Sequence, residues 1–279
     1  MSRNLLTRIA VAIVAIPAIL WISYQGGWWL FGMISLFAIG AALEFLINEG
    51  FRPVSVLFWL GLVTVGLLLA SRYPGLSWDG PIPFEPLVVI LSFMLIAGMI
   101  LATGRIPPAQ LFEKNVRLVW GVAYIGLLYP FVFLLGSHSA TGAYLSGDLL
   151  LFLFGLLWVG DTAAMGIGKW LGKHKLASAV SPNKTVEGFL GGLVGALLIG
   201  LLMSVWRLHD IPRVHLVSMA ICCSVFGQLG DLVESMWKRS LGIKDSSPVI
   251  PGHGGVLDRF DSLLFAAPVM YYYVTIFRL

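Results

Sequence analysis

Residues 186–206 read VEGFLGGLVGALLIGLLMSVW, an apolar run in which Glu187 is the one charged residue. About 20 mostly apolar residues form a helix long enough to cross the hydrocarbon core of a bilayer, which is roughly 30 Å thick. The run therefore predicts a membrane-spanning helix. The whole chain of 279 residues is 58% hydrophobic and 11% charged, whereas soluble domains have about 45–50% and about 25%. A water-soluble globular protein is excluded, because one core of this size cannot bury so much apolar surface.

Eight further apolar stretches of similar length lie on both sides of this run. We therefore predict an all-α, polytopic integral membrane protein with about nine transmembrane helices. The first stretch follows Arg3 and Arg8, but no small-residue cleavage site closes it, so we interpret it as a helix rather than a signal peptide. The nine predicted spans are residues 5–24, 27–46, 54–71, 86–103, 116–136, 148–165, 186–206, 214–234 and 262–277.

The lysines and arginines are distributed unevenly between the two ends of the predicted helices. Fourteen of the 18 lie at the N-terminus or in the loops that follow the second, fourth, sixth and eighth spans. The positive-inside rule then predicts that the N-terminus and these loops face the cytoplasm. The net charge of +4 thus reports orientation in a cytoplasmic (inner) membrane, and it does not predict a nucleic-acid partner.

Polar residues are concentrated in the second half of the chain. Residues 1–144 are predicted to form a transmembrane scaffold, because short loops join their helices and they contain no cluster of reactive side chains. Residues 145–279 are predicted to form a transmembrane catalytic half with two polar segments. These are GDTAAMGIGKWLGKHKLASAVSPNKTVEGFLGG at 160–192 and GQLGDLVESMWKRSLGIKDSSPVIPGHGGVLDRFDS at 227–262.

The second polar segment begins inside an apolar stretch. Its polar side chains recur at i, i+3, i+4 and i+7, so a helix with 3.6 residues per turn places them on one face. Ionisable side chains at membrane depth are costly and indicate a functional site by default. The residues on this predicted face are Asp231, Glu234, Ser235 and Lys238.

Two more acids follow the glycine-rich PGHGG at 251–255. Asp258 and Asp261 share a helix face if the chain is helical from Val256 onward. Carboxylates with few histidines or thiols nearby favour magnesium over zinc. Basic side chains beside such an ion can bind phosphoryl oxygens. The basic residues of this segment are Lys238, Arg239, Lys244 and Arg259.

The first polar segment supplies a second set of anion-binding groups. Residues 181–187, SPNKTVE, are predicted to begin a hydrophobic helix, where polar caps, free amides and the positive helix end favour an anion. Asp161 is interpreted either as a helix cap or as a ligand of the site cation. The two segments together predict phosphoryl transfer at a membrane surface.

Residues 235–261, SMWKRSLGIKDSSPVIPGHGGVLDRFD, resemble the signature of the phosphatidate cytidylyltransferase (CDP-diacylglycerol synthase) family. The shared features are Ser followed by Lys-Arg, then Lys-Asp, His-Gly-Gly and Asp-Arg-x-Asp. Residues 172–192, GKHKLASAVSPNKTVEGFLGG, resemble a second block of the same family. Trp237, Val186 and Met165 depart from the family's usual residues, but they occupy packing positions and leave every charged position in place.

The resemblance implies transfer of CMP from CTP to phosphatidate, which yields CDP-diacylglycerol and pyrophosphate in phospholipid biosynthesis. It implies that Asp231 and Asp258 bind Mg²⁺, with room for a second, monovalent cation, and that the enzyme is a homodimer. The nucleophile would be the lipid phosphate, which is already anionic, so alignment and charge neutralisation are what the protein must supply.

The resemblance and the residue chemistry together assign roles to individual positions. The predicted catalytic residues are Lys238, Arg239, Lys244, Asp245, His253, Arg259 and Asp261. The predicted substrate-binding residues are Ser181, Lys184, Thr185, Glu187 and Ser235. The predicted metal ligands are Asp231 and Asp258.

Simpler interpretations exist for several of these residues. Lys238 and Arg239 also fit an ordinary basic pair at a helix end. Asp261 either binds the metal or orients its neighbour. His253 is either catalytic or bonded to the loop backbone. Glu44, a single acid in the second span, is left unassigned.

Two other functions fit parts of the sequence. A transferase that acts on a different lipid phosphate, such as an archaeal-type or polyprenyl lipid, has the same chemical requirements. A cation-coupled transporter would explain acids within the spans, such as Asp161 and Asp231. The transporter does not explain the dense group of Lys, Asp, His and Arg in the last predicted cytoplasmic loop.

Overall fold

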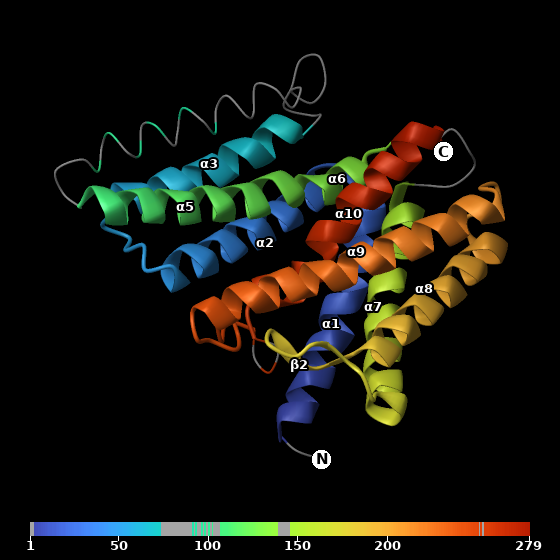
Figure 1. Ribbon diagram of the computed structural model, residues 1–279. Coiled ribbons are helices and arrows are strands. Elements are labelled where there is room, and N and C mark those ends of the chain that lie inside the picture. The colour runs from blue at the N-terminus through green and yellow to red at the C-terminus, as the bar shows by residue number, and fades with distance from the viewer. Residues whose placement is uncertain are drawn as a thin grey trace.

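The computed structural model describes residues 3–73, 107–138, 146–250 and 254–279, together with residues 91, 93, 96, 98, 100, 102 and 252. Its elements follow the chain as a set of long helices with one small hairpin (Figure 1). They are α1 (Arg3–Gln25), α2 (Gly27–Asn48), α3 (Val56–Arg72), α5 (Pro108–Leu128), α6 (Pro130–Gly136), α7 (Ser146–Leu171), β1 (Lys175–Ala177), β2 (Ser181–Thr185), α8 (Val186–Trp206), α9 (Arg213–Ser240) and α10 (Leu257–Phe277).

The described part of the chain contains six helical segments that are long and apolar enough to cross a membrane, rather than the nine predicted. They are α2, α5 together with α6, α7, α8, α9 and α10. Two shorter apolar helices, Val11–Gln25 and Val56–Arg72, coincide with the first and third predicted spans. The predicted span at 86–103 falls mostly outside the described residues. The chain is thus a polytopic membrane protein.

Three helices extend beyond their predicted ends into the polar segments. Helix α7 continues to Leu171, so Asp161 lies in its interior, and the interpretation of Asp161 as a helix cap is wrong. Helix α9 continues to Ser240 and therefore contains the whole predicted polar face. Helix α10 begins at Leu257, which places Asp258 and Asp261 in its first turns. A prediction from hydropathy underestimates the length of these helices, because their ends are polar.

An antiparallel hairpin of β1 and β2 interrupts the helical pattern, with Lys175 paired to Thr185 and Ala177 to Ser181. The prediction that residues 181–187 begin a helix is therefore wrong for residues 181–184, which lie in β2, and is confirmed for Thr185, Val186 and Glu187, which cap and begin α8. Helix α8 begins after Thr185, whose side chain accepts a hydrogen bond from Gly188 N at 3.1 Å. Pro182 suits a short two-stranded ribbon as well as a helix start, since each strand has an unpaired edge.

Helices α7, α8, α9 and α10 pack in succession against one another. Small residues allow α7 and α8 to approach closely, as is common between membrane helices. A Cβ built on Gly195 would lie 2.8 Å from Ala163 Cβ and 3.1 Å from the Val159 carbonyl oxygen.

In Figure 1 the hairpin and the α9–α10 connection lie toward the same end as the N-terminus.

Replacing Gly195 with Leu is expected to destabilise the protein by about 1–3 kcal/mol, because the side chain must push α7 away from α8. Thermal unfolding of the detergent-solubilised protein, followed by size-exclusion chromatography, measures the change. Gly66→Leu in α3 is the matched control, since a Cβ at Gly66 meets no atom of the described residues within 4 Å. Equal melting temperatures for the two variants would contradict the close packing of α7 on α8.

Candidate functional site

A cavity of about 750 Å³ lies among α7, the hairpin, α8, α9 and α10. It brings together side chains from both polar segments of the sequence, which are separated by the apolar body of α8. Its charged and polar lining consists of Asp161, Lys169, Lys175, Asn183, Lys184, Thr185, Gln228, Asp231, Lys238, Asp245, Asp258, Arg259, Asp261 and Ser262.

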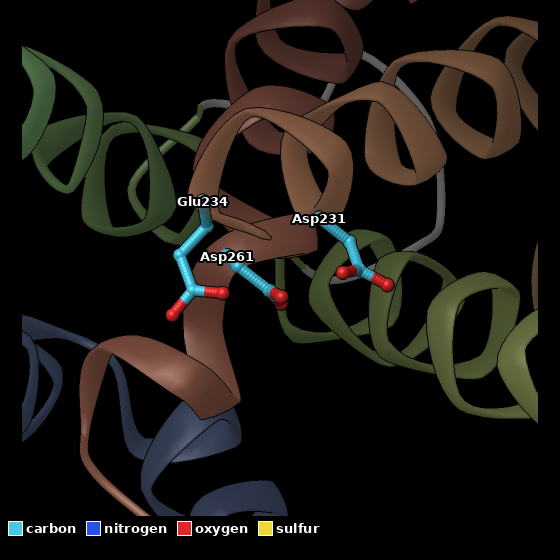
Figure 2. Close-up of side chains that lie close together, drawn as sticks. All are labelled: Asp231, Glu234 and Asp261. Atoms are coloured by element: carbon cyan, nitrogen blue, oxygen red, sulfur yellow. The ribbon is translucent and has the colours of Figure 1, made fainter. Parts of the chain in front are cut away.

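Three carboxylates of α9 and α10 lie close together here, two of them in the cavity lining and the third, Glu234, buried beside it. One oxygen from each of Asp231, Glu234 and Asp261 lies within 4.8 Å of the other two. Figure 2 shows Asp231 and Glu234 leaving α9 toward the same side, with Asp261 of α10 between them. The carboxylates of α9 and α10 thus meet, but the α10 member of this group is Asp261 and not Asp258, the second metal ligand that the family resemblance implies. A set of carboxylate oxygens close together suits a hard divalent cation such as Mg²⁺.

Lys238 connects the two acidic helices. Its Nζ lies 2.6 Å from Glu234 Oε2 on α9 and 2.6 Å from Asp258 Oδ1 on α10. The Lys238 side chain is 12% exposed and that of Glu234 is fully buried, so neither charge is solvated in the ordinary way. Charges so placed require partners, because an unpaired buried ion is strongly destabilising.

The hairpin is held to α9 by a second ion pair. Lys184 Nζ on β2 lies 2.7 Å from Asp231 Oδ2. The other Asp231 oxygen, Oδ1, accepts a hydrogen bond from Ser235 Oγ at 3.2 Å. Two lysines, Lys184 and Lys238, face four carboxylates, those of Asp231, Glu234, Asp258 and Asp261. The summed formal charge of these six side chains is negative, and a divalent cation would neutralise it.

The second oxygen of Asp258 is bound by the loop that precedes α10. Ser246 N and Gly255 N both donate to Asp258 Oδ2 at 2.8 Å. The Ser246 hydroxyl lies 3.1 Å from the same oxygen. Gly254 has a φ of +84°, and a Cβ there would come within 2.8 Å of Asp258 Oδ2. Asp258 is therefore fixed from two sides, by Lys238 and by backbone amides.

Most of the predicted site residues line this cavity, but five of the described ones do not: Ser181, Glu187, Ser235, Arg239 and Lys244. Glu187 accepts hydrogen bonds from Lys173 N at 3.1 Å and His174 N at 3.2 Å. Arg239 donates to the carbonyl oxygens of Val180 and Ile243. Ser181 lies on β2, away from the lining.

The remaining predicted residues have separate positions. Lys244 lines a neighbouring cavity of about 910 Å³, whose wall shares Asp245 and Arg259 with the first. Ser235 reaches the site through its hydrogen bond to Asp231. His253 lies outside the described residues.

Gln228 and Glu44 lie near the site, although the sequence assigned neither of them a role. Gln228 lines the cavity and donates from Nε2 to the Phe189 carbonyl oxygen at 3.3 Å. Glu44 of α2, only 6% exposed, contacts the loop before α10. A lone acid inside an apolar span is itself a signal of function, and that signal could have identified Glu44.

Comparison with known proteins covers nearly the whole chain. Residues 6–277 match the model of the cytidylyltransferase family. The phosphatidate cytidylyltransferase of Staphylococcus saprophyticus is 35% identical over 270 residues, or 97% of each chain. That of Staphylococcus aureus strain COL shows the same identity and coverage, and that of Staphylococcus haemolyticus is 34% identical over 94% of this chain and 96% of its own. The similarity confirms the resemblance seen in residues 235–261.

Proposed function

This chain belongs to the cytidylyltransferase family, and from that premise we propose that it is a phosphatidate cytidylyltransferase, which converts CTP and phosphatidate to CDP-diacylglycerol and pyrophosphate. Relatives with this name match 97% of the chain. The observation that supports the proposal best is the single cavity in which acids of α9 and α10 meet basic residues of the hairpin, α9 and α10.

The reaction is a direct displacement at phosphorus. An oxygen of the lipid phosphate forms a bond to the α-phosphorus of CTP, and the bond from that phosphorus to the bridging oxygen of the β-phosphate breaks. Pyrophosphate leaves with the electron pair. Because the nucleophile is already an anion, no side chain has to remove a proton from an alcohol, and the protein's task is alignment and charge neutralisation.

We propose that Asp231 and Asp258 hold Mg²⁺ and that Asp261 and Glu234 complete the acidic surroundings. The chemistry of the donor set fits, because oxygens of Asp231, Glu234 and Asp261 lie within 4.8 Å of one another, with no histidine or cysteine among them in the described residues. Asp258 is not in this group and is joined to it through Lys238, which contacts both Glu234 and Asp258. When bound, the ion neutralises charge on the phosphate oxygens. We also propose that the site binds a second, monovalent cation.

Basic side chains in the same cavity are proposed to bind the phosphate groups of the two substrates. Lys184, Lys238 and Arg259 line it, and Lys244 lies beyond the shared wall in the neighbouring cavity. Lys184 and Lys238 already touch Asp231 and Asp258, so phosphate oxygens and carboxylates would share these ammonium groups. Thr185 and Asn183 of the hairpin are proposed to contribute to the nucleotide pocket.

The proposed site opens where a water-soluble nucleotide and a bilayer lipid can meet. The positive-inside rule places the hairpin and the α9–α10 connection on the cytoplasmic side of the inner membrane. The enzyme is proposed to work as a homodimer, as the family resemblance implies.

The direct test uses the detergent-solubilised full-length protein with labelled CTP, phosphatidate and MgCl₂. We expect a lipid-linked CMP product that requires both the lipid and the metal ion, with pyrophosphate released in equal amount. Polyprenyl phosphate in place of phosphatidate is the comparison substrate. A product formed only with that lipid would assign a different lipid phosphate, and ion flux into liposomes without any liponucleotide would indicate a transporter.

A further inference from the structure

Glu44 lies far from the catalytic segments in the sequence, yet it is a buried carboxylate at the edge of the proposed site. It belongs to α2, in the half of the chain predicted to be a scaffold, and is 6% exposed. The Glu44 oxygens accept four hydrogen bonds. Ser246 Oγ at 2.8 Å and Leu257 N at 3.0 Å reach Oε2, and Ser247 Oγ at 2.5 Å and Val256 N at 2.8 Å reach Oε1.

The first consequence of these contacts concerns the start of α10. The first amides of a helix have no partner within the helix and are usually satisfied by the side chain of the N-cap residue. The N-cap of α10 is Val256, which cannot provide one. Glu44 takes that function from another helix, and its negative charge also matches the positive end of α10.

The second consequence concerns Asp258 directly. The hydroxyl of Ser246 lies 2.8 Å from Glu44 Oε2 and 3.1 Å from Asp258 Oδ2. One hydroxyl has one proton, so it donates to one of the two carboxylates at a time. Ser246 N meanwhile donates to Asp258 Oδ2 at 2.8 Å. Ser246 is therefore a direct link between Glu44 and the carboxylate on which the proposed reaction depends.

The surrounding packing leaves this link little freedom. A Cβ on Gly255 would overlap Ser246 Oγ and the Glu44 carboxylate, so the loop is pressed closely onto α2. One turn after Glu44, Asn48 Nδ2 donates to the Ser246 carbonyl oxygen at 2.7 Å. Ser246 is thus fixed to α2 at its backbone and at its side chain.

We propose that Glu44 is a positioning residue of the reaction: it fixes the start of α10 and, through Ser246, the orientation of the Asp258 carboxylate. The proposal rests on the proposed cytidylyltransferase function. It goes beyond it by giving the N-terminal half of the chain a defined part in the chemistry. Glu44 touches neither substrate nor metal in this account and acts through Asp258.

The test begins with Glu44→Gln, which keeps the shape and one acceptor oxygen but places an amide donor against two groups that also donate. The turnover number kcat is expected to fall by about 10- to 100-fold, the range typical of residues that orient a metal ligand. The KM for CTP is expected to stay constant, because Glu44 touches no substrate. A rise in KM with unchanged kcat would overturn the proposal.

A matched pair of serine variants separates positioning from simple anchoring of the loop. Both hydroxyls donate to Glu44, but only that of Ser246 also contacts Asp258. Ser246→Ala is expected to lower kcat by about 10-fold or more, whereas Ser247→Ala leaves kcat unchanged. Equal losses in the two variants would overturn the proposal. This pair decides the question alone if Glu44→Gln does not fold.

Glu49→Gln is the control for stability. Its carboxylate is also buried and joins helices, accepting hydrogen bonds from Trp237 Nε1 at 2.8 Å and Arg117 Nη1 at 3.0 Å. It contacts no residue of the loop before α10 among the described hydrogen bonds, so we expect a lower melting temperature with unchanged kcat. A kcat loss equal to that of Glu44→Gln would overturn the proposal. If the wild-type protein forms no liponucleotide, the proposed function fails instead.

Discussion

Asp231→Asn is expected to lower kcat/KM for CTP by more than about 100-fold, beyond the range for residues that only orient a ligand. Asp231 is the point at which the hairpin, α9 and the acidic group meet, since Oδ2 faces Lys184 and Oδ1 accepts from Ser235. Asparagine keeps the shape and the bond to Ser235. It removes the charge proposed to bind Mg²⁺, and it turns an amide toward the Lys184 ammonium. Product formation from labelled CTP measures the loss.

The folded state of this variant is expected to survive. Asp231 lies within 4.8 Å of two other carboxylates, so removing its charge lessens their repulsion. This gain offsets the loss of the partly exposed ion pair between Asp231 and Lys184, because ion pairs of that kind contribute little to stability. The melting temperature without magnesium should therefore not fall. Glu113→Gln on α5 is the control for losing a carboxylate charge outside the site. The Glu113 side chain is 63% exposed and pairs only with Arg117 among the described residues. Near-normal activity of Asp231→Asn would refute the metal assignment.

Residue spacing was enough to predict the face of α9 that forms the site. Two acids, a serine and a lysine at i, i+3, i+4 and i+7 must lie together on any helix, and the Lys238–Glu234 and Ser235–Asp231 contacts confirm it. The same reasoning placed Asp258 and Asp261 on one face of α10. Local periodicity determines such features, so no knowledge of the tertiary fold is required.

Other parts of the site depend on contacts that spacing does not encode. The hairpin around Ser181 was predicted as a helix start, because Pro, Asn and Thr suit a helix N-terminus and a turn equally well. The partners of Glu44 lie about 200 residues away in the chain, so no local pattern could identify them. The division into a scaffold and a catalytic half remains a prediction, and Glu44 shows how the first half reaches the site.

Asp258→Asn is also expected to lower kcat/KM for CTP by more than about 100-fold. This loss exceeds the range for residues that only orient a metal ligand. Its two oxygens face different donors: Lys238 Nζ at 2.6 Å on one side, and Ser246 N and Gly255 N at 2.8 Å on the other. An asparagine must present its amide N–H groups to one of these sides. In either orientation a donor meets a donor, and Lys238 loses one of its two negative partners.

The magnesium dependence of the residual activity distinguishes two roles for Asp258. If Asp258 binds the metal as proposed, the Mg²⁺ concentration for half-maximal activity should rise by about 10-fold or more. Lys238→Met is the matched variant, because it removes the ammonium group and leaves the carboxylate. Its activity should fall while its Mg²⁺ midpoint stays at the wild-type value. An unchanged midpoint in Asp258→Asn would mean that Asp258 acts by holding Lys238, and the acidic group of Asp231, Glu234 and Asp261 would then have to bind the metal without it.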